Sequence, residues 1–212
     1  MSRALFAILF STLCLSLGTR ASASPPDPAN CDVPDLITLV ARGAGGDADP
    51  LGIFTVVVRD FNNGPRANRE VVLDFSQCPD IRLSADQADP NVTVDCAAHS
   101  IARLTVVGGE ATFRVIGLAA NLGASPGSTG PCLKVYADTV FLKTVRVAAL
   151  DQNGGGVDGF DLSLFIADYF SGQSFARSDY DGSGTVDGND LSLWLAAFFA
   201  GGSNTGGGAA CP

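Results

Sequence analysis

From Cys31 to Ala149 the chain alternates short apolar runs with polar turn residues. Phe54-Thr-Val-Val-Val-Arg-Asp60 and Ala111-Thr-Phe-Arg-Val-Ile116 have the period of strands with one buried face. Gly108-Gly109 and Asp138 are typical of hairpin turns. Many short strands without a helical period predict an all-β sandwich over 31–149. The expected strands are Leu36–Ala41, Ile53–Asp60, Glu70–Phe75, Ile81–Ser84, Val92–Asp95, Ile101–Val107, Glu110–Ile116, Leu133–Ala137 and Val140–Val147.

After Leu150 the apolar pattern takes the period of an α-helix. Apolar side chains recur at i, i+3, i+4 and i+7 in two segments: Leu162, Phe165, Ile166, Tyr169 and Leu191, Trp194, Leu195, Phe198. The pattern predicts two helices that pack against each other. Further apolar residues outside these stripes make each helix apolar over a wide arc. Either the helices complete a small core or rest on the sandwich, or they present a face for a partner.

The two ends of the chain differ from these regions in composition. Met-Ser-Arg3, an apolar run and Ala21-Ser-Ala23 predict a signal peptide over 1–23, cleaved after Ala23, and a secreted or cell-surface protein. Residues 24–30 are expected to form a flexible leader and the Gly/Ser-rich residues 201–212 a flexible tail. No later apolar run approaches the roughly 20 residues that span a bilayer, so we expect no membrane span.

Residues Asp158–Phe170 and Asp187–Phe199 repeat one pattern at a constant offset of 29 residues, which predicts a duplicated loop–helix unit. The loop before the second helix, Asp179–Asp190, carries oxygen-bearing side chains at positions 1, 3, 5, 9 and 12 and Gly184 at position 6. That is the spacing of an EF-hand-type calcium loop, in which the glycine permits a sharp bend.

A hard divalent cation requires about six to eight oxygen ligands, which this loop supplies. We expect side-chain ligands from Asp179, Asp181, Ser183 and Asp187, the backbone carbonyl of Thr185, and the closing carboxylate of Asp190. The first loop offers Asp151, Asn153, Asp158 and Asp161. It spans eleven positions and has Gly155 where an oxygen ligand is expected, so its calcium site should be weaker or altered.

Two loop–helix units, each closed by Asp and without a long first helix, resemble the type I dockerin module over residues 150–200. The resemblance implies a small calcium-dependent domain that docks onto a cohesin-like protein, although the helices could also dock on the chain's own sandwich. Without a cation the Asp side chains would repel one another. We therefore expect the module to gain order when it binds Ca²⁺.

The β region has a resemblance of its own. Thr55-Val-Val-Val-Arg-Asp60, Asn63-Gly-Pro65, Val71-Val-Leu-Asp-Phe75 and Gly109-Glu-Ala-Thr-Phe113 resemble bacterial Ig-like domains of the invasin/intimin type, which implies a spacer, stalk or adhesion role. The expected fold class is mainly β, with an Ig-like sandwich followed by a small α-helical dockerin-like module. The alternative is a carbohydrate-binding part of an extracellular polysaccharide-degrading complex. A lone Tyr136 and the lack of Trp in 31–149 weigh against it.

Charge and side-chain inventory narrow the function further. The chain has a net charge of −9, and residues 150–212 hold eight Asp against Arg177 alone, which suits cations and disfavours nucleic acid. His99 is the single histidine, and it adjoins Ser100 without a recognisable catalytic pattern. We therefore expect a protein without enzymatic activity.

Five cysteines follow the predicted signal peptide, and in an oxidising compartment they indicate two disulfides and one remaining thiol. Spacing alone does not fix the pairing. The interpretation adopted is Cys78–Cys96, which closes a local excursion, and Cys31–Cys132, which joins an early strand to a late one. Cys211 would then be free or form an intermolecular bond.

Overall fold

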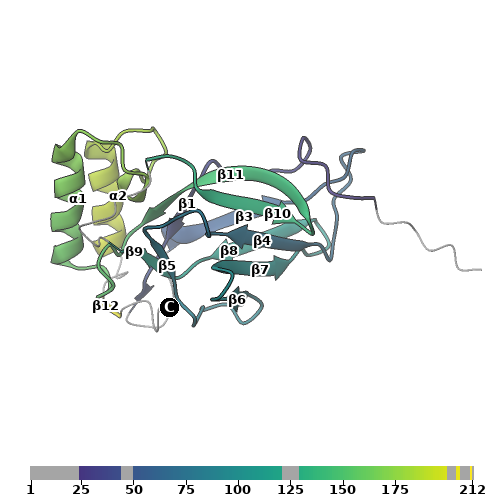
Figure 1. Ribbon diagram of the computed structural model, residues 1–212, viewed down its shortest axis with the longest axis horizontal. Coiled ribbons are helices and arrows are strands. Elements are labelled where there is room, and N and C mark those ends of the chain that lie inside the picture. Colours follow the sequence, from purple (N-terminus) through teal and green to yellow (C-terminus); the bar gives the residue numbers. More distant parts are fainter. Residues whose placement is uncertain (1–23, 44–49, 121–128, 200–203, 206–210, 212) are drawn as a thin grey trace, which may run out of the picture.

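The fold is mainly β, with two helices side by side at one end of the strands (Figure 1). The computed structural model describes residues 24–43, 50–120, 129–199, 204–205 and 211, so the predicted signal peptide lies outside the described residues. The strands are β1 Leu36–Leu39, β2 Arg42–Gly43, β3 Ile53–Val57, β4 Glu70–Asp74, β5 Ile81–Leu83, β6 Thr93–Asp95, β7 Ser100–Leu104, β8 Glu110–Arg114, β9 Gly117–Ala119, β10 Leu133–Ala137, β11 Val140–Ala149 and β12 Asn204–Thr205. The α-helices are α1 Gly159–Ser171 and α2 Gly188–Ala197, and short 3₁₀ helices are η1 Pro50–Gly52 and η2 Ala176–Ser178.

The largest sheet has six strands in the order β1-β11-β10-β4-β7-β6. Its pairs are antiparallel except for β1 and β11, which run parallel. The pairs β3–β8, β5–β9 and β12–β2 complete the strand pairing of the described residues. Alternation along β10 buries Leu133, Val135 and Ala137 and leaves Lys134 and Tyr136 on the outer face. The inward side chains share one buried core with those of β3, β5 and β8.

Each of the nine expected strands is present, with ends that differ by a few residues, and the structure adds the short strands β2, β9 and β12. The turn at Asp138 joins β10 to β11 as a hairpin. The hairpin predicted at Gly108-Gly109 is wrong, because β7 and β8 belong to different sheets and the turn crosses between them. Gly109 has a φ of +77°, and a Cβ there would lie 2.5 Å from the carbonyl oxygen of Val58. This tight approach explains the glycine.

The two predicted disulfides have a different pairing in the structure. Cys78 bonds to Cys132 and Cys96 bonds to Cys211, while Cys31 is the free cysteine of the described residues. Asp74 of β4 lies opposite Lys134 of β10, so the chain leaving β4 meets the chain entering β10. The predicted pairs are therefore wrong because sheet partners, not sequence neighbours, bring the sulfurs together.

Both chain ends contact the β region where the structure describes them. In the expected flexible leader, the Asp27 N–H donates to the Arg59 carbonyl over 2.8 Å, and the Arg66 guanidinium donates to the Ser24 carbonyl. In the expected flexible tail, β12 pairs with β2 and Cys211 is 2 % exposed. At these positions the expected flexible segments are held by backbone hydrogen bonds and a disulfide.

A second buried core joins the helices to the strand ends. In this core Phe165 of α1 and Trp194 of α2 pack with Tyr180 of the intervening loop, and with Val40 and Ala148. The ring of Trp194 donates to the Leu150 carbonyl over 3.2 Å, and the Tyr180 hydroxyl donates to the Ala149 carbonyl over 2.9 Å. Within the described part of the chain, no helix is long and apolar enough to span a membrane.

The buried face of α1 differs from the predicted apolar stripe. Phe165 is buried as expected, but Ile166 and Tyr169 are 41 % and 43 % exposed. Asp161 and Asp168 take the buried face in their place. Arg177 of η2 binds Asp168 through two hydrogen bonds of 2.8 and 2.6 Å, so this carboxylate is buried with its countercharge. The prediction for Ile166 and Tyr169 is wrong, because Asp168 with its partner Arg177, and Asp161 with backbone N–H groups, occupy the buried face.

Candidate metal centre

The second loop, Asp179–Asp190, leads from η2 into α2, and a cap fixes the start of that helix. Asp187 caps α2, because its carboxylate accepts from the Asn189 N–H over 2.7 Å. Asp190 returns the bond by accepting from the Asp187 N–H over 2.8 Å. This reciprocal pair is a capping box. Gly184 has a φ of +90°, as expected for the glycine at the sharp bend.

Three carboxylates of this loop converge on one point. One oxygen each of Asp179, Asp181 and Asp190 lies within 4.8 Å of the other two. Asp179 and Asp190 are buried and Asp181 is exposed. Among the described residues, no other group of acidic, histidine or cysteine side chains gathers in this way. The spacing suits a shared cation, since opposing carboxylates at this range repel without one.

Asp179 has one satisfied and one unsatisfied oxygen. Its Oδ2 accepts from the Gly184 N–H over 2.9 Å and from the guanidinium of Arg146 on β11. Its Oδ1 is buried with no hydrogen-bond partner. Burial raises the pKa of Asp179, although the Gly184 N–H and Arg146 act against the shift. A buried carboxylate oxygen without a partner is costly, and a bound cation would satisfy it.

Asp190 and Asp181 are held in place by backbone amides. Asp190 Oδ1 accepts from the N–H groups of Tyr180 and Asp181, over 2.6 and 3.1 Å. Burial raises the pKa of Asp190, and the neighbouring charge of Asp181 adds to it. Asp181 accepts from the Ser183 N–H over 2.8 Å, which lowers the pKa of Asp181. The closing carboxylate is thus fixed before any ion binds.

The remaining predicted ligands of the second loop lie outside the carboxylate group. The Ser183 hydroxyl contacts the hydroxyl and the carbonyl of Thr185, over 3.1 and 3.2 Å. Asp187 is engaged as the helix cap and is not among the converging carboxylates. The structure therefore gathers Asp179, Asp181 and Asp190, and it leaves Ser183, Thr185 and Asp187 bound to neighbours within the loop.

The two loops are held by one repeated set of hydrogen bonds. The Gly156 N–H donates to Asp151 in the first loop as the Gly184 N–H donates to Asp179 in the second, both over 2.9 Å. The Gln152 N–H donates to Asp161 as the Tyr180 N–H donates to Asp190, both over 2.6 Å. The Asp158 N–H donates to Asp161 over 2.7 Å as the Asp187 N–H donates to Asp190 over 2.8 Å. The predicted sequence repeat is therefore also a repeat of structure.

This correspondence locates the residue that the first loop lacks. One residue separates Gly156 from Asp158, whereas two separate Gly184 from Asp187. Val157 and Val186 both contribute to the second core, so they match each other. Thr185 has no counterpart. The first loop therefore lacks the position whose backbone carbonyl was the predicted ligand in the second.

The first loop satisfies its carboxylates internally. Asp151 accepts from the N–H groups of Asn153, Gly154 and Gly156, over 3.0, 2.6 and 2.9 Å. The Asn153 side chain accepts from the Gly155 N–H, and Asp158 caps α1. Burial raises the pKa of Asp161 to about 6. Asp151, Asn153, Asp158 and Asp161 lie in one loop but form no group of converging carboxylates.

Sequence reasoning missed Arg146 as part of this centre. Its guanidinium binds Asp179 and donates to the carbonyl of Gly182, both in the second loop. In the sequence it lies in a strand of alternating pattern, where an outward arginine carries no distinguishing signal. Gln152 was also missed, because it lies in the first loop at a position that is not a predicted ligand. Its amide donates to Ser178 and Tyr180 over 2.9 and 3.3 Å and links the two loops.

The geometry can hold one hard cation in the second loop, with Asp179 and Asp190 as preset ligands and Asp181 at the solvent side. The group contains oxygen ligands and neither histidine nor cysteine, which favours calcium or magnesium over zinc.

Comparison of the chain with protein-family models, curated proteins and solved structures found no match.

Proposed function

We propose that this is an exported, non-catalytic protein whose C-terminal loop–helix pair binds Ca²⁺ and attaches the chain to a protein partner. In this proposal residues 150–200 form a dockerin-like module, and the Ig-like β-sandwich of residues 31–149 is the part that is presented or spaced. The proposed partner is a cohesin-like protein. The sequence spacing of the second loop and the fold of its carboxylates support the calcium site.

The buried Oδ1 of Asp179 is the observation that carries the proposal. It lies in the carboxylate group, has no hydrogen-bond partner, and belongs to a side chain that is 1 % exposed. In a loop of this spacing, position 1 supplies a carboxylate ligand to the ion, and the glycine at position 6 permits the sharp turn. The other oxygen of Asp179, Oδ2, already accepts from the Gly184 N–H. The free oxygen is therefore the one that a cation would bind.

The attachment surface proposed is the outer face of α1. Phe160, Ile166, Tyr169 and Phe170 are 73 %, 41 %, 43 % and 78 % exposed. The acids of this helix, Asp161 and Asp168, are buried, so its outer face carries no charge. A neutral apolar face of this kind is typical of protein–protein contact. The metal loop and α1 share the second core, through which an ion could stabilise the face.

The calcium proposal is tested by calorimetric titration of Ca²⁺ into chelator-treated protein and two matched variants. We expect one ion to bind per chain, in the second loop. Asp179→Asn should weaken binding by at least about tenfold, because a charge-assisted contact contributes roughly 1.5–3 kcal/mol. Asp187→Asn keeps a residue that can cap the helix and lies outside the carboxylate group, so its affinity should stay within about twofold. Equal affinities in the wild type and Asp179→Asn would contradict the proposed site.

The attachment proposal is tested with an immobilised type I cohesin domain in calcium and in chelator. Phe170→Ser should abolish calcium-dependent binding and leave Ca²⁺ affinity unchanged. Phe61→Ser is the matched control, because Phe61 is 67 % exposed and lies in the β3–β4 loop. Binding that persists in Phe170→Ser would show that this face is not the docking surface.

A second candidate function is carbohydrate binding on the outer face of the six-stranded sheet. Tyr136 and Phe141 are directly opposite in the register, with ring centroids 5.7 Å apart. Beside them lies a hollow of about 330 Å³ that contains hydroxyls, carboxylates and the Tyr136 ring. Aromatic rings that stack on sugars and acceptors for their hydroxyls suit a neutral saccharide. The lining residues are Val72, Asp74, Ser76, Ala98, Ser100, Tyr136 and Asp138.

Affinity electrophoresis in gels with soluble polysaccharides separates this candidate from the first. Retardation of the wild type that is lost in Tyr136→Ala, but kept in Phe61→Ala, would support glycan binding on this face. Equal migration in gels with and without polysaccharide would exclude it for the polysaccharides tested.

A further inference from the structure

Arginine side chains in this acidic protein are paired, with one exception among those that the structure describes. The paired arginines donate to carboxylates or backbone carbonyls: Arg59, Arg66, Arg69, Arg82, Arg103, Arg146 and Arg177. Arg114 on β8 makes no such contact with the described residues. Arg114 is half-buried, and no nitrogen of its guanidinium is among the buried polar atoms, so this unpaired charge stays accessible to an anion.

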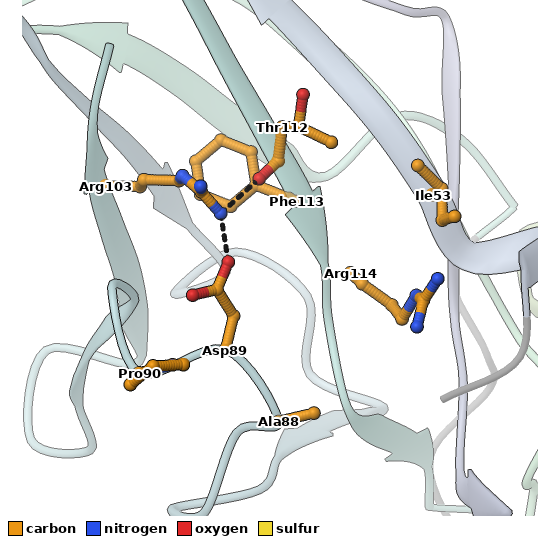
Figure 2. Close-up of a pocket in the computed structure, with 8 residues that line it drawn as sticks. All are labelled: Ile53, Ala88, Asp89, Pro90, Arg103, Thr112, Phe113 and Arg114. Atoms are coloured by element: carbon orange, nitrogen blue, oxygen red, sulfur yellow. Dashed lines mark hydrogen bonds and ion pairs between the residues drawn. The ribbon is translucent and has the colours of Figure 1, made fainter. Parts of the chain in front are cut away.

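Arg114 lines a pocket between the β3–β8 pair and the segment that precedes β6 (Figure 2). The cavity has a volume of about 410 Å³, within the usual range for small-molecule sites. Ile53 of β3 lies directly opposite Arg114 in the register and stands beside it on the same wall. The other walls come from Ala88, Asp89, Pro90, Arg103, Thr112 and Phe113.

The walls of this pocket are fixed by interactions of their own. Arg103 donates to the Asp89 carboxylate and, over 2.7 Å, to the Thr112 carbonyl, as the dashed lines in Figure 2 show. Asp89 also accepts from the Asn91 N–H over 2.8 Å. Phe54 and Phe113 stack with centroids 5.4 Å apart and hold β3 to β8. The unpaired cation thus faces a preformed cavity.

The charges in the pocket select the ligand. Asp89 neutralises Arg103, so the remaining charge is the single positive charge of Arg114. A guanidinium fork matches the two oxygens of a carboxylate. Phosphate, with a charge near −2, would meet one free cation and the nearby carboxylate of Asp89. Ile53, Pro90 and Phe113 offer apolar surface for the body of the ligand.

We propose that the pocket lined by Ile53, Asp89 and Arg114 binds a small monocarboxylate, with Arg114 holding the carboxylate group. Such a group could come from an acidic sugar or from a peptide C-terminus. The inference is independent of the calcium module, because all the residues involved lie in the β region.

The proposal is tested by two-dimensional amide NMR of the full mature chain, titrated with sodium glucuronate and, separately, N-acetylglycine. Methyl glucuronate ester and inorganic phosphate are the comparison ligands. We expect saturable shifts at residues 53, 88–90 and 112–114 with at least one carboxylate, and none with the ester. Arg114→Gln should weaken the binding by about tenfold, the loss expected for a charge-assisted hydrogen bond. Arg82→Gln removes the same charge outside the pocket and should have no effect.

The ligand that saturates identifies the source of the carboxylate. A response to glucuronate alone indicates an acidic sugar, and a response to N-acetylglycine alone indicates a peptide terminus. Three results would overturn the proposal: no saturable shift with either carboxylate, phosphate binding as tight as carboxylate binding, or equal affinity in Arg114→Gln and Arg82→Gln. Thermal melting of both variants separates loss of binding from loss of fold.

Discussion

At the scale of single residues, Arg146 places a positive charge beside the carboxylates of the second loop. Its guanidinium reaches from β11 to Asp179 Oδ2 and the Gly182 carbonyl, and leaves Asp179 Oδ1 free. The arginine therefore neutralises part of the carboxylate charge without filling the ion position. This changes the expectation that repulsion alone keeps the metal-free loop disordered, because one of the carboxylates already has a cation.

Replacement of Arg146 should have opposite effects on metal affinity and on the metal-free fold. Arg146→Gln removes a positive charge beside the ion, so Ca²⁺ affinity should rise by about tenfold, which corresponds to roughly 1.4 kcal/mol. The melting temperature in chelator should fall, because the carboxylates lose their partner. Calorimetric titration and melting curves with and without Ca²⁺ measure both. A variant that loses calcium affinity would show that Arg146 positions the ligands instead.

His99 should make the protein less stable as the pH falls. Burial lowers the pKa of His99 from its usual 6.5, and the positive charge of Arg82 adds to the shift. The unfolded chain therefore binds a proton that the folded chain disfavours, and the free energy of unfolding falls as the pH drops below about 6.5. His99 has a φ of +54°, so Asn is the substitution that fits the backbone.

The measurement is the difference in unfolding free energy between wild type and His99→Asn, by urea titration from pH 7.5 to 5. As the pH falls, the wild type should lose unfolding free energy relative to His99→Asn. Asp161, whose raised pKa acts in the opposite direction near pH 6, is present in both proteins and cancels. A difference that does not change with pH would contradict the argument.

At the scale of elements, the two loops differ in length by a single position. Their capping boxes and three of their amide-to-carboxylate hydrogen bonds correspond, yet only the second loop gathers three carboxylates. The first loop lacks a counterpart of Thr185 and has Gly155 at the place of Ser183. At the ligand positions, one deletion, one lost hydroxyl and Asn153 in place of Asp181 thus distinguish the first loop from the second.

Restoring both features should give the first loop an ion site. Insertion of Thr between Gly156 and Val157, together with Gly155→Ser, recreates the twelve-position spacing. Titration should then show one additional calcium ion per chain, and Asp151→Asn in that background should remove it. Unchanged stoichiometry in a folded variant would mean that the amide bonds to Asp151 are too strong to open.

The sequence predicted elements that depend on local pattern and missed those that depend on distant neighbours. Alternation located the main strands, and loop spacing selected Asp179, Asp181 and Asp190. Three-residue β9 is too short for a period to be visible. The face of α1 was misjudged because pattern rules place Asp168 in solvent, whereas Arg177 pairs with it in the interior. Arg146 was missed because its partner lies in another element.

At the scale of the whole molecule, two disulfides connect distant parts of the chain. Cys78–Cys132 spans 54 residues and Cys96–Cys211 spans 115. The sequence could not indicate these pairs, since β5 and β6, which lie between Cys78 and Cys96, belong to different sheets. Cys78 and Cys96, which are near in sequence, therefore bond to different cysteines.

Loss of the longer crosslink should destabilise the protein by about 2–4 kcal/mol, because the unfolded chain gains freedom. The double variant Cys96→Ser/Cys211→Ser should show this in urea unfolding under oxidising conditions. Cys31→Ser is the control, and it should change stability by less than about 1 kcal/mol. Peptide mapping of the unreduced protein checks the pairing. Recovery of a Cys78–Cys96 peptide would contradict the connectivity described here.

The Cys96–Cys211 bond also has a mechanical consequence. The chain leaves the β region at Ala149, forms both helices and returns to the strands at β12. It then reaches Cys211, whose N–H donates to the Leu83 carbonyl over 2.7 Å. The helices therefore lie within a covalently closed circuit. Tension applied at α1 would divide between β11 and the sulfur bridge, and neither path alone would carry the full load. In the attachment role proposed above, the load would therefore be shared between two covalent paths.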